Sequence, residues 1–391
     1  MTMRPCWVEI STRSLEDNYR FLSSLAGGSA ELLAVVKSDA YGHSLALCAP
    51  AAVRAGARWL GVTSVEEAVE ARALCSEARV LVMSGCFPGE GAALVEHGLT
   101  AVAWEPSQLD ELEHAARFAG LAPGSMPVHL EIDTGMSRQG VGPEGLDLIL
   151  GRFPAASPLR LEGVLTHLFA ADETDGRATE EQLARLDEAL AQIAAAGLQP
   201  EWLSVGASAT LLNGDASGLA VRARRWGMKA MIRPGLALYG VAPQFEPDEP
   251  PAVAAARKRL KPVLTWKTRI VGVRSVPAGA QVGYNGTFVA TEPLRLALLP
   301  VGYADGLDRR VGNRFSLLVR GERAPLVGRI SMDLAVLDVT EIDGVDAGDE
   351  VVILGRQGSQ TITAYEHAKA TGTIPWEVFT RIGARVRRVL V

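Results

Sequence analysis

Short apolar runs alternate with segments of helical periodicity between residues 30 and 240. Each run ends in a polar or glycine-containing turn, and the segment that follows places apolar residues three and four positions apart. This alternation predicts a series of strand–helix units. We expect eight strands, at residues 32–36, 59–63, 80–84, 100–104, 128–132, 161–166, 202–205 and 231–233.

Several of the intervening helices carry their own start and stop signals. Ser64 with Glu67, and Thr179 with Gln182, have the spacing of a capping box, in which side chains satisfy the first free N–H groups of a helix. After the second of these, Gly197 supplies a stop. One face of this helix is apolar and is expected to pack on a sheet, through Leu183, Leu186, Leu190 and Ile193.

Eight strands alternating with helices predict an α/β fold, a TIM-like (β/α)8 barrel. A doubly wound open sheet is the alternative, because the order of strands is not visible in a sequence. Such a sheet usually has fewer strands and a glycine-rich first turn, and no GxGxxG follows the first run. The barrel is therefore the favoured architecture.

The pattern changes after a proline-rich and charged passage at residues 243–262. Beyond it lie short segments rich in Val, Leu and Ile, separated by Gly, Pro and Asp turns. We expect a barrel domain at residues 1–245 and a mainly β C-terminal domain at residues 246–391. The strands predicted for the second domain are 263–276, 294–301, 315–319, 324–330, 334–339 and 350–354.

Composition narrows the class of protein. With 48% hydrophobic and 21% charged residues, the chain resembles an ordinary globular enzyme. The net charge of −6 provides no general attraction to nucleic acid, and the basic run Arg222, Arg224 and Arg225 reads as solvated surface. The four cysteines form no CxxC pair, so neither a metal site nor a disulfide framework is expected. No apolar stretch predicts a signal peptide or membrane span, so we expect a cytoplasmic protein.

Lys37 follows the first predicted strand, at the end of a barrel where active sites are built. A lysine in that position is by itself most often a surface residue. Its surroundings, AVVKSDAYGH, resemble the cofactor-lysine motif of the alanine racemases. Further motifs support the resemblance in the same order along most of the chain: EIDTGMSRQG, THLFAAD, IRPGLALYG, VGYNGTF with LPVGYADG, and GRISMD.

The resemblance implies an enzyme that interconverts L- and D-alanine with pyridoxal 5'-phosphate and supplies D-alanine for cell-wall peptidoglycan. It also implies a homodimer with shared active sites. Lys37 would bind the cofactor covalently and act as the base on one face of the substrate, and Tyr284 of the partner subunit would act on the other. A tyrosine with a pKa near 10 is a poor base, and His167 is the residue expected to assist it.

Arg233 matches the residue that faces the cofactor's pyridine nitrogen. An arginine stays protonated in proteins, so it donates a hydrogen bond without protonating that nitrogen. The ring is then a weaker electron sink, which disfavours transamination. The resemblance assigns the phosphate to Tyr41, Ser208, Gly235 and Leu236. It assigns the substrate carboxylate to Arg138 and to the backbone N–H of Met332 of the partner subunit, and the pocket entrance to Tyr303. Asp305 follows Tyr303 in the same motif, and both could otherwise be turn residues of the C-terminal domain.

Three positions depart from the family pattern. Glu131 stands where many members have a carbamylated lysine, and we expect it to pair with Arg138 through a built-in negative charge. Ala207 stands where a polar residue is usual, so one hydrogen bond near the cofactor is missing. Trp376 stands where a tyrosine commonly reaches toward the phosphate, and an indole donates only one hydrogen bond.

Other functions remain open at this level. The three departures lie close to the expected pocket, so a racemase acting on other amino acids is one alternative. A related decarboxylase is another, although such enzymes pair the pyridine nitrogen with a carboxylate, unlike Arg233. A non-enzymatic cofactor carrier would lack the second domain. Taken alone, His167 and Met332 would each be read as core residues.

Overall fold

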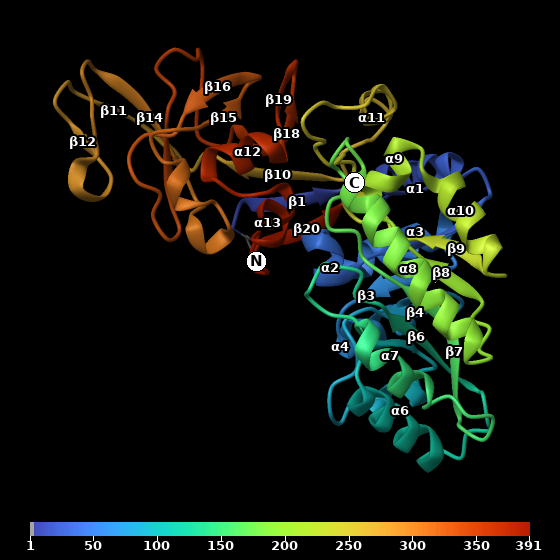
Figure 1. Cartoon of the computed structure of the whole chain (residues 1–391). Helices are drawn as coiled ribbons and strands as arrows, with labels where there is room; N and C mark the ends of the chain where they lie inside the picture. The colour runs from blue at the N-terminus through green and yellow to red at the C-terminus, as the bar shows by residue number, and fades with distance from the viewer. Residues whose placement is uncertain (1–3) are drawn as a thin grey trace. The chain divides into compact units, whose positions relative to one another are not determined.

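The computed structural model describes residues 4–391 of the chain, which form two compact units (Figure 1). The barrel unit comprises residues 13–40 and 48–261. The β unit comprises the residues up to Thr12, residues 41–47 and residues 262–391. The two units are described separately below.

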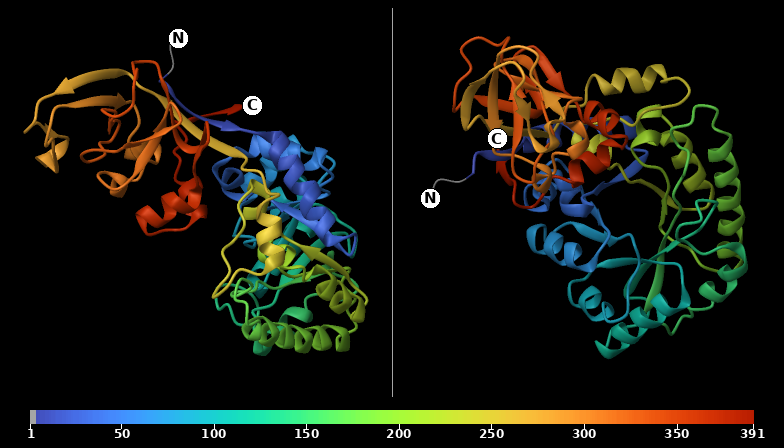
Figure 2. Two further views of the ribbon diagram at one scale, coloured as in Figure 1. Left: turned by 90° about the horizontal axis from the view of Figure 1, so that it is seen from above. Right: turned by 90° about the vertical axis from the view of Figure 1, so that its left-hand side faces the viewer.

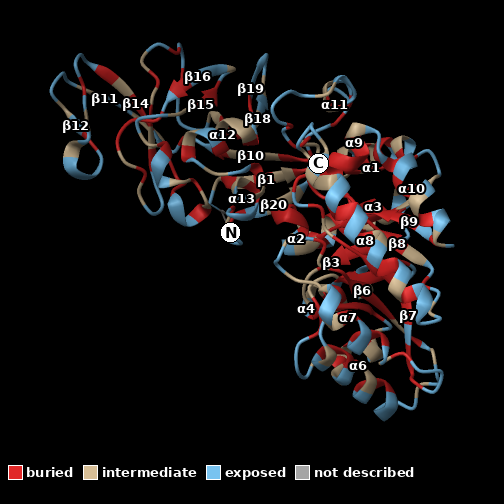
Figure 3. Cartoon of the chain, in the orientation of Figure 1, coloured by how far each residue is buried: buried red, intermediate tan, exposed pale blue. Residues whose placement is uncertain are grey.

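The barrel unit contains a closed barrel of eight parallel strands, as predicted. The last strand pairs with the first, through Ala230 opposite Ala30 and Ile232 opposite Leu32. Most strand residues are buried on both faces (Figure 3), which explains why they read as continuous apolar runs. The strands are β2 (Ala30–Val35), β3 (Trp59–Val62), β4 (Arg79–Val82), β5 (Thr100–Ala103), β6 (Met126–Glu131), β7 (Leu159–Leu165), β8 (Trp202–Ser204) and β9 (Lys229–Ile232).

Helix α1 precedes the first barrel strand, the other helices follow barrel strands, and together they surround the ring that the strands form (Figure 2). They are α1 (Thr12–Ala26), α2 (Lys37–Gly42), α3 (Leu45–Arg54), α4 (Val65–Leu74), α5 (Gly91–Glu96), α6 (Pro106–Phe118), α7 (Pro143–Leu150), α8 (Arg177–Ala195), α9 (Ser208–Asn213), α10 (Ala216–Arg225) and α11 (Pro251–Arg257), with the 3-10 turn η1 (Leu236–Tyr239). The apolar face predicted for α8 is buried.

One predicted helix start is confirmed and the other is wrong. Ser64 caps α4, and its hydroxyl accepts the backbone N–H of Glu67. Helix α8 instead begins at Arg177 after Gly176, which places Thr179 and Gln182 inside the helix. Gln182 is fully buried and binds neighbouring loops, so its spacing from Thr179 was not a capping signal.

The turn that follows Lys37 is left-handed. Residues Ser38, Asp39, Ala40 and Tyr41 have φ between 51° and 56°, a region that costs an L-residue roughly 1–2 kcal/mol. The turn is held partly from outside, because the backbone N–H of Asp39 donates to Oε1 of Glu67 in α4 at 2.8 Å. The direction of the chain immediately after Lys37 is thus imposed by tertiary contacts rather than by local preference.

The β unit is built on a seven-stranded sheet in the order β16-β15-β18-β10-β1-β20, with β19 paired to β18. A three-stranded sheet, β11-β14-β17, and the hairpin β12-β13 complete it. The strands are β1 (Cys6–Ile10), β10 (Leu264–Arg269), β11 (Gly272–Val276), β12 (Gln281–Val282), β13 (Phe288–Val289), β14 (Leu294–Leu299), β15 (Ser316–Val319), β16 (Glu322–Pro325), β17 (Ala335–Asp338), β18 (Glu350–Gln357), β19 (Gln360–Ile362) and β20 (Arg387–Leu390).

The β unit differs from the prediction in three respects. The first strand of the chain, β1, was assigned to the barrel domain at residues 1–245 but pairs with β10 and β20. The single strand expected at 263–276 is two strands in different sheets. Helical elements were not foreseen; they are α12 (Ala364–Thr371), α13 (Pro375–Thr380) and the 3-10 turns η2 (Tyr284–Gly286), η3 (Tyr303–Asp305) and η4 (Arg309–Val311).

Two expected absences can be compared with residues 4–391. Among these residues, no helix combines the length and the apolar character needed to cross a membrane. The described cysteines are all buried and none forms a disulfide, and no group of three or more His, Cys, Asp or Glu side chains in this range has the geometry to hold a metal ion.

Candidate active site

The barrel brings together five of the predicted site residues at the carboxyl ends of its strands. Lys37 follows β2, Arg138 lies in the loop after β6, and His167 follows β7. Ser208 begins α9 after β8, and Arg233 follows β9. Residues far apart in the sequence meet here because parallel strands end at the same rim.

Arg233 is the most strongly held of these side chains. One terminal nitrogen, Nη1, donates to the carbonyl oxygen and the hydroxyl of Ser204 at 2.8 and 2.6 Å, and Nη2 donates to the carbonyl oxygen of Thr166 at 2.8 Å. Its Nε forms no hydrogen bond with the described residues. Burial lowers the pKa of Arg233 to about 10, so the buried guanidinium remains charged at neutral pH.

The arginine also defines the protonation of His167. Nη2 of Arg233 lies 3.4 Å from Nδ1 of His167, and a guanidinium can only donate. Nδ1 must therefore be the acceptor. Burial, followed by the charges of Arg233, Arg138 and Lys37, lowers the pKa of His167 to about 3. At neutral pH the imidazole is neutral, and its proton is on Nε2.

Gln182, which the sequence analysis assigned only to a helix start, holds the loop after β7 together with Thr134. The side-chain amide of Gln182 donates to the carbonyl oxygen of His167 at 3.0 Å and to Oγ1 of Thr134 at 2.9 Å. Its Oε1 accepts the backbone N–H of Phe169. The sequence did contain a sign of this role. Gln182 lies on the apolar face of a predicted helix, and a buried side-chain amide requires hydrogen-bond partners.

Lys37 lies in an environment that favours its neutral amine. Burial, together with the positive charges of Arg138 and Arg233, lowers the pKa of Lys37, and the carboxylate of Glu67 opposes this shift. Removal of a charged amine from water and placement beside other cations both disfavour the protonated form. A neutral amine is the form that attacks a carbonyl carbon or accepts a proton.

The predicted pair between Glu131 and Arg138 is wrong. Oε2 of the buried Glu131 accepts a hydrogen bond from Nε2 of Gln139 at 2.5 Å, and the same amide donates to the carbonyl oxygen of Met83 at 3.1 Å. Arg138 is exposed and forms no ion pair with Glu131 among the described residues. Gln139, the next residue along the chain, is therefore the hydrogen-bond partner of Glu131 in place of Arg138.

Glu131→Gln is expected to stabilise the barrel slightly at alkaline pH. Burial raises the pKa of Glu131, although Gln139 and the nearby arginines oppose it. The charged form is thus disfavoured in the fold, and stability falls as pH rises from the unfolded value of about 4.3 through the raised folded value. We expect a melting temperature roughly 2 °C above wild type at pH 8, and no difference at pH 4. A lower melting temperature at pH 8 would show that the carboxylate stabilises the site.

A cradle of backbone N–H groups lies between the last two strand ends. The hydroxyl oxygen of Ser208 accepts the N–H groups of Gly235 and Ala237 at 3.2 and 3.1 Å, and Leu236 opens η1. Ala207 is the N-cap of α9 and provides no side-chain hydrogen bond to the start of that helix. Oγ1 of Thr210 is buried without a hydrogen-bond partner among residues 4–391.

The remaining predicted residues belong to the β unit. Tyr41 is buried, and burial raises the pKa of its hydroxyl. Tyr284 in η2, Tyr303 in η3 and Met332 are 68%, 43% and 53% exposed, respectively. Trp376 is half-buried in α13. Tyr284, Tyr303 and Met332 are therefore accessible to a binding partner in the single chain.

Comparison with known proteins agrees with this arrangement. The family model "Alanine racemase, N-terminal domain" matches residues 10–243, and "Alanine racemase, C-terminal domain" matches residues 263–390. The alanine racemase of Syntrophobacter fumaroxidans is 38% identical over 97% of this chain and 96% of the relative.

Solved structures of alanine racemases are similar over the full length. That from Streptomyces lavendulae superposes with a TM-score of 0.89 at 34% identity, covering 100% of this chain and 98% of the other. That from Bartonella henselae, with covalently bound pyridoxal phosphate, gives a TM-score of 0.84 at 26% identity and covers 99% of both chains. The chain therefore belongs to the alanine racemase family.

Proposed function

We propose that this protein racemises alanine with pyridoxal 5'-phosphate as cofactor, supplying D-alanine for peptidoglycan in the cytoplasm. The observation that supports this most directly is the buried Arg233 beside a neutral His167, on the same barrel rim as a lysine with a lowered pKa. A positively charged donor in place of a carboxylate distinguishes this rim from that of a decarboxylase.

The residues of the rim fit this cofactor. Nε of Arg233 has no partner among the described residues and can donate to the pyridine nitrogen. The phosphate would bind at Ser208, Gly235 and Leu236, because the N-terminal ends of α9 and η1 favour an anion. Arg138 is exposed on the rim and can reach a phenolic oxygen or a carboxylate. When bound, the cofactor withdraws electrons from the substrate Cα and so acidifies its hydrogen.

Lys37 would then serve as the base on one face of the substrate. Its lowered pKa increases the fraction of neutral amine at physiological pH, the form that accepts a proton. The left-handed turn after Lys37 fixes the backbone from which this side chain projects. Arg233 remains charged and does not donate its proton, so the ring nitrogen is not protonated from that side.

Tyr284 of a partner subunit would act on the opposite face. Because Nε2 of His167 carries the proton, it can donate to the phenolic oxygen and stabilise the tyrosinate. Tyr284 and Met332 are exposed in the β unit of a single chain, and association into a homodimer would give them a binding surface. We therefore include shared active sites in the proposal.

Tyr284→Phe is expected to reduce racemisation of alanine by about 10²–10⁴-fold, the usual contribution of a positioned general acid or base. Purified protein supplied with the cofactor would be given L-alanine, and D-alanine would be followed by chiral chromatography. Tyr365→Phe, half-buried in α12, is the matched control and should retain the wild-type rate.

The same assay separates the alternatives. Racemisation of serine or another amino acid in preference to alanine would show that the substrate was assigned wrongly. Ala207 and Trp376 would then be the positions to examine. Release of carbon dioxide without racemisation would establish a decarboxylase and overturn the proposal. A wild-type rate in Tyr284→Phe would show that Tyr284 is not the second base, while alanine would remain the substrate.

A further inference from the structure

A buried carboxylate in the β unit collects four hydrogen bonds that the chemistry described so far does not use. Asp305 is 1% exposed. Arg4 binds it through both terminal nitrogens, Nη1 to Oδ1 at 2.7 Å and Nη2 to Oδ2 at 2.8 Å. Nε of Arg385 donates to Oδ1 at 2.7 Å, and the backbone N–H of Gly302 donates to Oδ2 at 2.8 Å. Two guanidinium groups on one buried carboxylate form a strongly specified geometry.

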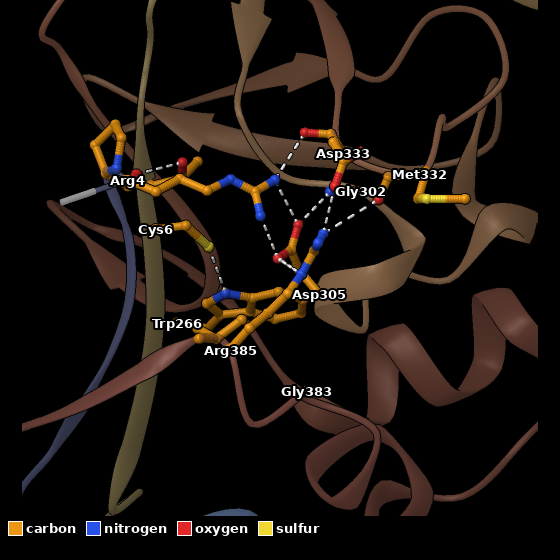
Figure 4. A network of polar contacts seen from close by, with 12 residues as sticks. Arg4, Cys6, Trp266, Gly302, Asp305, Met332, Asp333, Gly383 and Arg385 are labelled. Atoms are coloured by element: carbon orange, nitrogen blue, oxygen red, sulfur yellow. Dashed lines mark hydrogen bonds and ion pairs between the residues drawn. The ribbon is translucent and has the colours of Figure 1, made fainter.

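Arg4 and Arg385 also bind a second loop, at residues 332–333, as Figure 4 shows. Nη2 of Arg4 donates to the carbonyl oxygen of Asp333 at 2.8 Å. Nη2 of Arg385 donates to Oδ1 of Asp333 at 2.7 Å and lies 3.5 Å from the carbonyl oxygen of Met332. Two carboxylates and two guanidinium groups thus balance in charge. We call Arg4, Asp305, Asp333 and Arg385 the Asp305 network.

The two loops are also joined directly through their backbones. The N–H of Tyr303 donates to the carbonyl oxygen of Ser331 at 3.0 Å, and that of Ala304 to the carbonyl oxygen of Met332 at 3.1 Å. The approach is so close that a Cβ atom on Gly302 would lie 2.2 Å from the Ser331 oxygen. Residues 302–305 and 331–333 therefore form one fixed piece of backbone.

This fixed backbone presents exposed side chains. In Figure 4 the Met332 side chain points away from the carboxylate of Asp305, and Met332 and Tyr303 are each about half exposed. A network serving stability alone would have no reason to converge on two exposed loops. We propose that the Asp305 network positions the peptide of Met332 and the ring of Tyr303 against the substrate carboxylate. This role rests on the proposed function, in which both residues serve the partner's pocket.

The network members are thus positioning residues, and their loss should weaken substrate binding. In Asp305→Asn the new amide group would face N–H donors, so the clamp on both loops loosens. We expect KM for L-alanine to rise about tenfold or more while kcat stays within about twofold, because the carboxylate is bound in ground state and transition state alike. Inhibition by propionate, which offers the carboxylate without the amine, should weaken in parallel.

A second readout is independent of activity. Amide hydrogen exchange of the holoenzyme should become faster in peptides covering residues 302–306 and 330–334, since those N–H groups depend on the clamp. Arg385→Met removes one arm of the network and is used if Asp305→Asn fails to fold. Arg274→Met, exposed on β11, is the control and should leave KM, propionate inhibition and exchange unchanged.

The outcomes are distinct. Unchanged KM and propionate inhibition in a folded Asp305→Asn or Arg385→Met, with an active wild type, would overturn the positioning role alone. Faster exchange spread evenly over the β unit would also overturn it, because the network would then serve general stability. An inactive wild type would refute the proposed function and this inference together.

Discussion

Lys37→Ala is expected to abolish racemisation, with a loss of at least about 10⁴-fold, because the substitution removes the covalent attachment of the cofactor and one of the two bases. The amine of Lys37 lies on the barrel rim, where burial and nearby positive charges lower its pKa. Racemisation would be followed by chiral chromatography. Covalent attachment would be followed by mass spectrometry after reduction with borohydride.

The matched control is Lys229→Ala, at the amino end of β9 and therefore at the opposite end of the barrel strands. Lys229 is exposed and pairs with Glu201 at 2.9 Å. This variant should keep both the wild-type rate and the reducible cofactor adduct. An adduct that persists in Lys37→Ala would show that another lysine binds the cofactor, and the assignment of Lys37 would be wrong.

Glu162→Gln is expected to destabilise the barrel by about 2–3 kcal/mol. Glu162 is buried in β7 and accepts hydrogen bonds from Arg79 at 3.0 and 2.6 Å and from Arg160 at 2.8 Å. Nε2 of the fully buried His129 lies 3.4 Å from it. Removal of one partner from a buried pair costs about 3–5 kcal/mol, and the partial exposure of both arginines reduces this figure.

The loss should depend on pH in a defined direction. Burial by itself raises the pKa of Glu162, but the contact with His129 and the hydrogen bonds from Arg79 outweigh it and lower the pKa well below the usual range. The contribution is therefore present above the unfolded value of about 4.3 and is lost as pH falls through the folded value. Thermal melting at pH 7 should show a decrease of about 5–10 °C, which shrinks below pH 4.

Glu201→Gln is the control for this measurement. Glu201 forms one exposed ion pair, with Lys229, and such pairs contribute little to stability. Its melting temperature should match that of the wild type across the pH range. A Glu162 variant that melts with the wild type at pH 7 would show that desolvation cancels the attraction of the arginines.

The sequence predicted the barrel well because its signal is local. Each barrel strand is a continuous apolar run, and each run is followed by a helix that packs on it, so neighbouring residues carry the information. Strand β1 was misassigned for the opposite reason. Its main partner, β10, lies more than 250 residues away, with Cys6 opposite Thr268, and nothing in residues 6–10 specifies that pairing.

For the site too, the sequence predicted the features that depend on neighbouring residues and missed those that depend on the folded path of the chain. Lys37, His167 and Arg233 could be placed after strands from the pattern alone, but their roles came from family motifs. The choice between Arg138 and Gln139 as the partner of Glu131 depends on the path of one loop. The side chain of Asp133 accepts the N–H groups of Gly135 and Ser137 there. Spacing along the chain does not reveal which of two consecutive side chains such a turn directs inward.

The pairing of β1 with β20 has a consequence for biosynthesis. Among the described strands, Cys6–Ile10 is made before the others, and one of its two neighbours in the sheet, Arg387–Leu390, is made after them. The barrel strands are all complete by Ile232, so that unit can close while translation continues. The edge of β1 that pairs with β20 must stay unpaired until Arg387–Leu390 has left the exit tunnel. Slow release of the nascent chain would therefore prolong the exposure of a sheet edge that invites aggregation.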